Sequence, residues 1–511
     1  MERPREFACG GCAGAWMLME GGVLSGEQRG RNGVEGAGAG LAAEAGRGSK
    51  ALWYAVWGAM GAVACASALV AANGSPSAAS IEGTYGLLLS VLLAAVATVQ
   101  LVRGMSFLLG KETALAAVVL VLFGFAQLGH YLIPGPSAGA GVDFATYYTV
   151  GHEAAQGRFG EMYHLPLYPD GRIDLRTFPF IYPPLFAVLM RPFTFLPVRN
   201  AYFLWNGVDV MLIVASCWMA LGLGDKKLSC RLALILSVGV LSFYPLIHEL
   251  HLGQVGGWIL FLWTGSSWLL ARNRIWFSAL CFAAATMIKL TPVIAIPLFV
   301  FHRRWKWLAA YCCWMLVLLG FSVWQVGWAA QKEFVGKVLP SISCGAPVFQ
   351  NASLFGFVQE LLLGRVFRAE EQPLTIAPVV CMVSKAVALV TYAIVMVRFY
   401  LGRREQGVVR QLMLAMLLSL VISPISWWQH YVLALAPLIF LWDMMRETDR
   451  DWLLTTTALV TGTNVAGFAL MLSSNHAIQL LLEGVVPCLT LGLVYFRIPG
   501  EELVGGNSKG A

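Results

Sequence analysis

The sequence predicts an all-α polytopic membrane protein, a bundle of about 13–14 transmembrane helices. The first observation is composition: of 511 residues, 58% are hydrophobic and only 12% are charged, whereas a soluble globular chain carries about 25% charged residues. The second is that long apolar runs recur along the chain, and the third is that Lys and Arg cluster between these runs. Such clusters indicate membrane topology, and with a net charge of only +7 no nucleic-acid partner is expected.

The apolar pattern divides the chain into four parts. Residues 1–50 are rich in Gly, Ala and Arg, show no apolar period and are predicted to be a disordered cytoplasmic tail. Residues 51–112 are predicted to hold two N-terminal transmembrane helices and 113–497 the main transmembrane domain, and 498–511 to form a flexible C-terminal tail.

Spans and their sides follow from the apolar runs and the basic residues between them. A helix needs about 20 apolar residues to cross a bilayer, and cytoplasmic loops carry the excess of Lys and Arg. This rule predicts a multi-pass protein of the cell (inner) membrane with both termini in the cytoplasm. The candidate runs are 51–72, 84–102, 113–133, 201–222, 232–247, 255–271, 275–289, 291–302, 306–329, 376–400, 410–423, 430–445, 452–472 and 477–496.

Two apolar stretches are predicted not to cross as simple helices because prolines interrupt them. Lys289-Leu290-Thr291-Pro292 interrupts the run between two basic clusters, because proline lacks the amide hydrogen that a helix interior needs. We expect a hairpin of two short spans there, with Lys289 at its outer turn. The run 178–197 contains five prolines and an arginine, so we expect a juxtamembrane or re-entrant helix, with a full crossing as the alternative.

The cysteines are expected to be structural. Most of the 11 lie within apolar runs, Cys381 among them, and such cysteines are typically small buried hydrophobic residues. Cys344 lies in a polar segment predicted outside the membrane, where the sequence offers it no partner cysteine.

The predicted topology places the polar segments 134–177, 248–254, 330–375 and 423–430 on the extracytoplasmic face, together with the Lys289 turn. Asp143 follows a membrane exit in the first segment. A carboxylate at a lipid–water boundary suits a general base, since it is ionised near neutrality yet partly desolvated. The alternative is an aspartate that caps the helix after it.

The other outer segments carry candidate binding groups. Lys289 is a cation that needs an anion such as a phosphate, unless its amine simply extends to the interface. His430 could donate a hydrogen bond to a phosphate, and Trp427 could stack on a sugar or only anchor the chain at the interface. The amide of Gln254 could hold sugar hydroxyls. His248 and His251 are three residues apart, which is weak evidence for a metal ligand pair, so a polar helix end is preferred and no metal is predicted.

Taken in order, these segments resemble glycosyltransferase family 87, the polyprenyl-phosphate-mannose-dependent membrane enzymes of the GT-C type. The resemblance covers about 130–445. The matching elements are Asp143-Phe144 with Tyr147-Tyr148, Gly157, Tyr163, Tyr182-Pro183-Pro184, Gly253-Gln254, Lys289 with Pro292, Arg303-Arg304-Trp305, Asn351 with Ser353-Leu354, and Ser423 through His430.

The resemblance implies a GT-C-like bundle and an inverting transfer of a hexose, expected to be mannose, from a polyprenyl-phosphate donor to a glycan or glycolipid acceptor outside the cytoplasm. It implies Asp143 as the general base and no cofactor. Lys289, His430, Gln254, Tyr147, Trp427 and Asn351 then bind the donor phosphate or the substrates.

Two positions depart from the family pattern. Gly256 stands where the family commonly has Asn, and Gln429 precedes His430 where the family commonly has two histidines. These departures bear on the donor sugar more than on the reaction class.

Two other functions remain as alternatives. A transporter or flippase for a lipid-linked sugar would need a charged path through the membrane, for which only Lys289 and Asp209 are candidates. A non-catalytic scaffold is the third hypothesis, and an open polar cleft at Asp143 argues against it.

Overall fold

The computed structural model confirms an all-α membrane protein in the part of the chain that it describes. These residues are 141–224, 240, 243–368, 371–444, 457, 461 and 476–497. Within them the chain folds into helices, and extended pairing is limited to the isolated bridges Leu167–Ile173 and Asn351–Trp427. The predicted tails 1–50 and 498–511 lie outside the described residues, as do the two spans predicted in 51–112.

Four helices of the described ranges are long and apolar enough to cross a membrane. At 1.5 Å per residue, helices of this length span roughly 30 Å, the thickness of the hydrocarbon core. Large apolar side chains on them point outward, including Leu316, Trp324 and Leu389, as expected of a surface covered by lipid. The four are α6 (Val198–Leu221), α12 (Trp305–Val326), α16 (Pro378–Leu401) and α21 (His476–Phe496).

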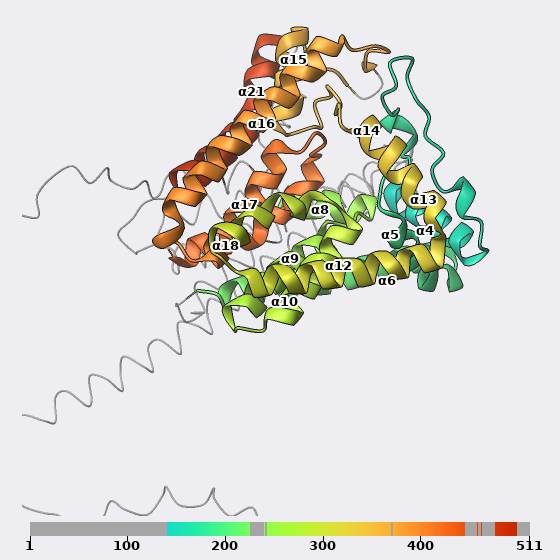
Figure 1. Ribbon diagram of the computed structural model, residues 1–511. Coiled ribbons are helices and arrows are strands. Elements are labelled where there is room, and N and C mark those ends of the chain that lie inside the picture. Colours follow the sequence, from blue (N-terminus) through green and yellow to red (C-terminus); the bar gives the residue numbers. More distant parts are fainter. Residues whose placement is uncertain are drawn as a thin grey trace, which may run out of the picture.

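The long helices form two groups around a buried one. In Figure 1, α6 and α12 run together with α9 (Gly256–Ala271) and α10 (Ile275–Ile288), while α15 (Leu354–Leu363) lies with α16 and α21. The central helix α17 (Val408–Ile422) packs against members of both groups and buries almost all its side chains. A helix that is apolar all round belongs inside a bundle, so α17 joins the two groups.

Both proline-containing runs are interrupted. Helix α10 ends at Ile288, Lys289 has extended backbone, and a 3₁₀ turn η4 (Thr291–Ala295) leads into α11 (Ile296–Phe301), so the predicted break is confirmed. In the run 178–197, α5 (Pro184–Met190) and the 3₁₀ turn η3 (Arg191–Phe195) together rise roughly 20 Å, too little to cross the bilayer. The side chains of α5 are almost all buried, which agrees with a re-entrant or juxtamembrane helix.

Short helices make up most of the described outer segments. The first outer segment is tied to the third, because Asp170 accepts hydrogen bonds from Arg172 and from the backbone amide of Ile376. The short elements are α4 (Val142–Ala155), η1 (Phe159–Glu161), η2 (Leu175–Thr177), α8 (Tyr244–Leu252), α13 (Trp328–Glu333), the π turn η5 (Phe334–Val338), α14 (Leu339–Ile342), η7 (Gly402–Arg404), η8 (Trp428–Ala434) and α18 (Leu435–Met444).

The cysteine expectations are partly wrong. Cys344 forms a disulfide with Cys381, their Cα atoms 5.4 Å apart, which joins the outer segment 330–375 to the first turn of α16. The sequence did not indicate this pairing because Cys381 belongs to an apolar run. The first turn of a membrane helix nevertheless lies at the interface, where Cys381 can reach a cysteine of the outer segment. Cys312, Cys313 and Cys488 are exposed on the surfaces of α12 and α21, where a thiol faces lipid rather than the interior.

Candidate active site

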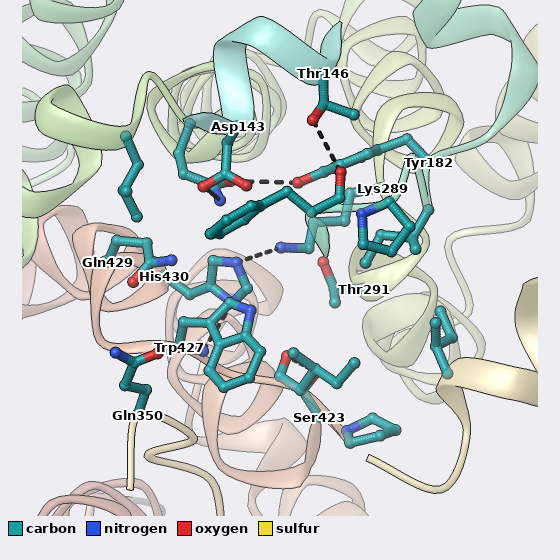
Figure 2. Close-up of a pocket in the computed structure, with 18 of the residues that line it drawn as sticks. Asp143, Thr146, Tyr182, Lys289, Thr291, Gln350, Ser423, Trp427, Gln429 and His430 are labelled. Carbon is teal, nitrogen blue, oxygen red and sulfur yellow. Dashed lines mark hydrogen bonds between the residues drawn. The ribbon is translucent and has the colours of Figure 1, made fainter. Parts of the chain in front are cut away.

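One cavity collects residues from all the predicted outer segments. It has a volume of about 620 Å³ and is lined by parts of α4, α8, the Lys289 break, η5, α14 and the loop before η8. Figure 2 shows Asp143, Lys289 and His430 pointing toward the same space from three separate segments. Of the seven residues predicted for the site, Asn351 does not line this cavity; those that do are Asp143, Tyr147, Gln254, Lys289, Trp427 and His430.

Asp143 is the second residue of α4, and its carboxylate does not cap that helix. The cap position is Gly141, where no side chain closes the helix end. The backbone amide of Gly141 donates to the carbonyl of His251 at 2.7 Å, which ties the start of α4 to the end of α8. The Asp143 carboxylate instead accepts a hydrogen bond of 2.6 Å from Nε2 of Gln254, so the capping alternative does not describe it.

The surroundings of Asp143 suit proton transfer near neutral pH. Burial raises the pKa of the Asp143 carboxyl to about 6, while the hydrogen bond from Gln254 and the charge of Lys289 act in the opposite direction. A base works best when its pKa lies near the working pH. Asp143 is therefore mostly ionised at pH 7 and still basic enough to accept a proton.

Gln254 lies between Asp143 and two buried tyrosines. Its Oε1 is 3.0 Å from the hydroxyl of Tyr147 and 3.2 Å from that of Tyr182, and the two hydroxyls are 2.7 Å apart. Tyr163 holds this pair from behind by donating to the backbone carbonyl of Tyr182 at 2.7 Å. The sequence indicated Tyr182 only through its Tyr-Pro-Pro motif, and nothing in that motif predicts a contact with Gln254.

Lys289 and His430 meet on another side of the cavity, with 3.0 Å between Nζ and Nε2. Nδ1 of His430 accepts a hydrogen bond from the backbone amide of Trp427 at 3.2 Å, which places the imidazole proton on Nε2. A protonated amine has no lone pair to accept that proton. Both groups are then donors at one place, and an anion beside the pair, within reach of both nitrogens, would satisfy both.

The charge state of Lys289 is balanced by nearby acids. Burial lowers the pKa of the Lys289 amine to about 8, and the carboxylates of Glu249 and Asp143 act in the opposite direction. Lys289 therefore remains mostly protonated at pH 7. A bound anion would raise its pKa again, because an opposite charge favours the charged form.

Glu249 also supports the site, a role that no sequence pattern indicated. Its carboxyl group is fully buried and accepts a hydrogen bond from the backbone amide of Gly256, which opens α9. Burial raises the pKa of Glu249 well above its ordinary value, and the bond from Gly256 acts in the opposite direction. A Cβ at Gly256 would lie 2.6 Å from Oε1 of Glu249, and one at Gly257 would lie 2.2 Å from Oδ1 of the buried Asp209. Glycine at position 256 is thus required by the approach of Glu249.

Asn351 holds the loop before η8 in place. Its side chain is fully buried, and Nδ2 donates to the carbonyls of Ala346 at 3.0 Å and Pro424 at 2.9 Å. Its Oδ1 accepts from the amide of Ser426 at 2.9 Å and from the hydroxyl of Ser353 at 2.9 Å. The amide group is therefore fully used within the protein, and it shapes the segment that leads to Trp427 and His430.

His248 and His251 also line the cavity, with stacked rings 6.5 Å apart. Across the described residues, three or more His, Cys, Asp or Glu side chains nowhere gather in an arrangement that could hold a metal ion. The pair is thus part of the polar end of α8 that lines the cavity.

Residues 180–424 match the model of glycosyltransferase family 87. The chain is a membrane glycosyltransferase related to family 87. The predicted resemblance is thereby confirmed over the stretch that carries Tyr182, Gln254 and Lys289. Asp143 and His430 lie outside the matched stretch of this glycosyltransferase, but both line the same cavity.

Two curated proteins are similar to this glycosyltransferase over most of its length. One, from Mycobacterium tuberculosis, is 26% identical over 337 residues, which cover 65% of this chain and 73% of the relative. The other, from Mycolicibacterium smegmatis, is 27% identical over 326 residues, which cover 62% of this chain and 73% of the relative. Both are named polyprenol-phosphate-mannose-dependent alpha-(1-2)-phosphatidylinositol pentamannoside mannosyltransferase.

Proposed function

We propose that this glycosyltransferase moves a hexose, mannose in the first instance, from a polyprenyl-phosphate donor to a glycan or glycolipid acceptor on the extracytoplasmic side of the membrane. The observation that carries the proposal is the polar part of the cavity, where one carboxylate and two nitrogen donors face the same space. The names of the two mycobacterial relatives support the donor class and the sugar. The basic clusters between the spans support the extracytoplasmic location of the cavity.

The cavity offers polar surroundings for the phosphate of the donor and apolar surroundings for its prenyl chain. Its polar groups meet around Asp143, Lys289 and His430, while much of the remaining lining is apolar, including Leu290, Ile294, Phe334, Leu339 and Ile342. A prenyl chain needs an apolar surface, and its phosphate needs cations and hydrogen-bond donors.

The reaction is a direct displacement at the anomeric carbon. A new bond forms between the acceptor oxygen and this carbon as the bond to the phosphate oxygen breaks, and its electron pair leaves with the phosphate. Asp143 takes the proton of the attacking hydroxyl. Lys289 and His430 stabilise the added negative charge of the departing polyprenyl phosphate.

Of two further predicted residues, Trp427 supplies a surface for the sugar and Tyr147 does not. Trp427 lines the cavity beside His430, and an indole ring suits the apolar face of a hexose. Tyr147 lies at the bottom of the Asp143 side, where its hydroxyl is used within the protein. Tyr147 thus acts through the position of Gln254 rather than by direct contact with the donor.

A transporter or flippase is the competing function. Its charged path was expected to use Lys289 and Asp209, but Asp209 is buried against the start of α9 while Lys289 faces the cavity. The match to a glycosyltransferase family favours the enzyme.

The test is to incubate the purified protein with polyprenyl-phosphate mannose and other polyprenyl-phosphate hexoses, and to score free polyprenyl phosphate together with the glycosidic product. We expect both products from the wild type and neither from Asp143→Asn, which keeps the shape of the side chain but cannot accept the proton. Normal transfer by that variant would remove Asp143 as the base. Movement of intact donor across sealed vesicles without a glycosidic product would instead favour the transporter.

A further inference from the structure

The Asp143 carboxylate is held by a side chain whose orientation the protein itself dictates. A glutamine amide can be turned over, so Gln254 could present either oxygen or nitrogen to its neighbours. Oε1 lies 3.0 Å and 3.2 Å from the hydroxyls of Tyr147 and Tyr182, and a hydroxyl proton needs an acceptor. The tyrosines therefore keep Oε1 on their side and direct Nε2 toward Asp143, 2.6 Å away.

The backbone around Gln254 is fixed as well. Gly253 adopts a left-handed conformation with φ of 68°, which ends α8 and turns the chain toward α4. A Cβ at Gly253 would lie 2.6 Å from the Cβ of Phe144, the neighbour of Asp143, so only glycine allows this approach. The carbonyl of Gln254 accepts the indole N–H of Trp205 at 3.0 Å.

We propose that Gln254 is a positioning residue for the general base, held in one orientation by the Tyr147–Tyr182 pair, and that it does not serve as a sugar ligand. This inference rests on the proposed role of Asp143. It goes beyond that role, because it assigns Tyr147, Tyr182 and Gln254 to the control of one carboxylate. It also accounts for the Gly253-Gln254 pair in the sequence, since the turn and the amide are needed together.

The tyrosine pair has a specific consequence for mutants. Three contacts join the two hydroxyls and Oε1, but the hydroxyls carry only two protons. If either tyrosine becomes phenylalanine, the remaining hydroxyl can still donate to Oε1. Removal of both hydroxyls leaves Oε1 without a donor and frees the amide to turn. The pH shift in the double variant should therefore be larger than the sum of the shifts in the two single variants.

The test is the pH dependence of kcat for Gln254→Met, Tyr147→Phe, Tyr182→Phe and the double tyrosine variant. A hydrogen bond to a carboxylate favours its ionised form, so its loss should move the acidic limb of the profile upward by roughly one pH unit. We expect this shift in Gln254→Met and in the double variant, and less than half of it in either single variant. Tyr311→Phe is the control, since it removes a buried hydroxyl that contacts Thr286 and does not line the cavity.

A second measurement separates this inference from the role of Asp143. Carbodiimide labelling of Asp143 at a series of pH values, located by mass spectrometry, follows protonation of the carboxyl without any turnover. An upward shift of the labelling midpoint in Gln254→Met supports the inference even if Asp143→Asn proves active and the proposed base is wrong. An unmoved midpoint, together with a raised KM for polyprenyl-phosphate mannose, would overturn it and make Gln254 a substrate ligand.

Discussion

The cavity has two polar sides that are built differently. The carboxylate side consists of Asp143, Gln254, Tyr147 and Tyr182, and its hydrogen bonds run from one side chain to the next. The nitrogen side consists of Lys289 and His430, and its two groups meet as donors. If the proposed mechanism holds, the difference means that the base is positioned before substrate arrives, whereas the nitrogen side is completed by the phosphate of the donor.

The largest effect should come from the carboxylate side. Asp143→Asn should lower kcat by on the order of 10²–10⁴-fold, the usual contribution of a general base. Donor KM should change little, because the proton moves only in the transition state. Steady-state rates of polyprenyl phosphate release measure both quantities. A large rise in KM with kcat preserved would mean that the carboxylate binds substrate instead.

On the nitrogen side, the main effect should be on binding rather than on kcat. Lys289→Met should weaken the binding of free polyprenyl phosphate by roughly 10–100-fold, since a hydrogen bond between charged groups contributes about 1.5–3 kcal/mol. Calorimetry with the purified protein measures the affinity, and Lys337→Met is the control, because that lysine lies exposed beside Glu333. Equal affinities of the wild type and Lys289→Met would show that Lys289 does not bind the phosphate.

Each side should also set one limb of the pH profile, the carboxylate side the acidic limb and the nitrogen side the basic limb. kcat/KM should rise through about pH 6 as Asp143 loses its proton and fall through about pH 8 as Lys289 becomes neutral. The basic limb of kcat should lie higher, because the bound phosphate stabilises the lysine cation. Lys289→Arg should extend the basic limb, since a guanidinium stays charged there. A profile flat from pH 5 to 9 would contradict both assignments.

The smallest effect on catalysis should come from Asn351, because its side chain holds the loop before η8 and does not contact the substrate. Asn351→Ala leaves buried backbone groups of Ala346, Pro424 and Ser426 without partners, which should cost roughly 1–3 kcal/mol of stability. The midpoint of thermal unfolding in detergent should fall while donor KM stays near the wild-type value. Ser353→Ala removes the cap of α15 and one hydrogen bond to Asn351 but leaves the Asn351 contacts to the backbone, and it should cost about 1 kcal/mol. A selective rise in KM for Asn351→Ala would restore its predicted role in binding.

Local chemistry in the sequence was enough to predict the helices and the break at Lys289. Proline at 292 and the basic clusters act within a few residues, and so does the apolar pattern of each span. The convergence of Asp143, Lys289 and His430 followed from topology, because it required only that their segments share one face of the membrane.

Contacts between distant residues could not be predicted in this way. Gln254 contacts Tyr147 across 107 positions and Tyr182 across 72, and no pattern in the chain marks those partners. Glu249 looked like one polar residue in a helix end, and its burial depends on how α8 meets α9. Asn351 was predicted to bind substrate because side-chain chemistry does not reveal which groups the protein already satisfies.

The link between Cys344 and Cys381 also bears on biogenesis. Protein disulfides persist in oxidising compartments and are rare in the cytosol, where thiols are kept reduced. If the segment 330–375 lies outside the cytoplasm, as we propose, its link to α16 would form only after translocation. A cell that oxidises thiols poorly would then yield enzyme with an untethered loop, so oxidative folding capacity becomes a condition for expressing this transferase in active form.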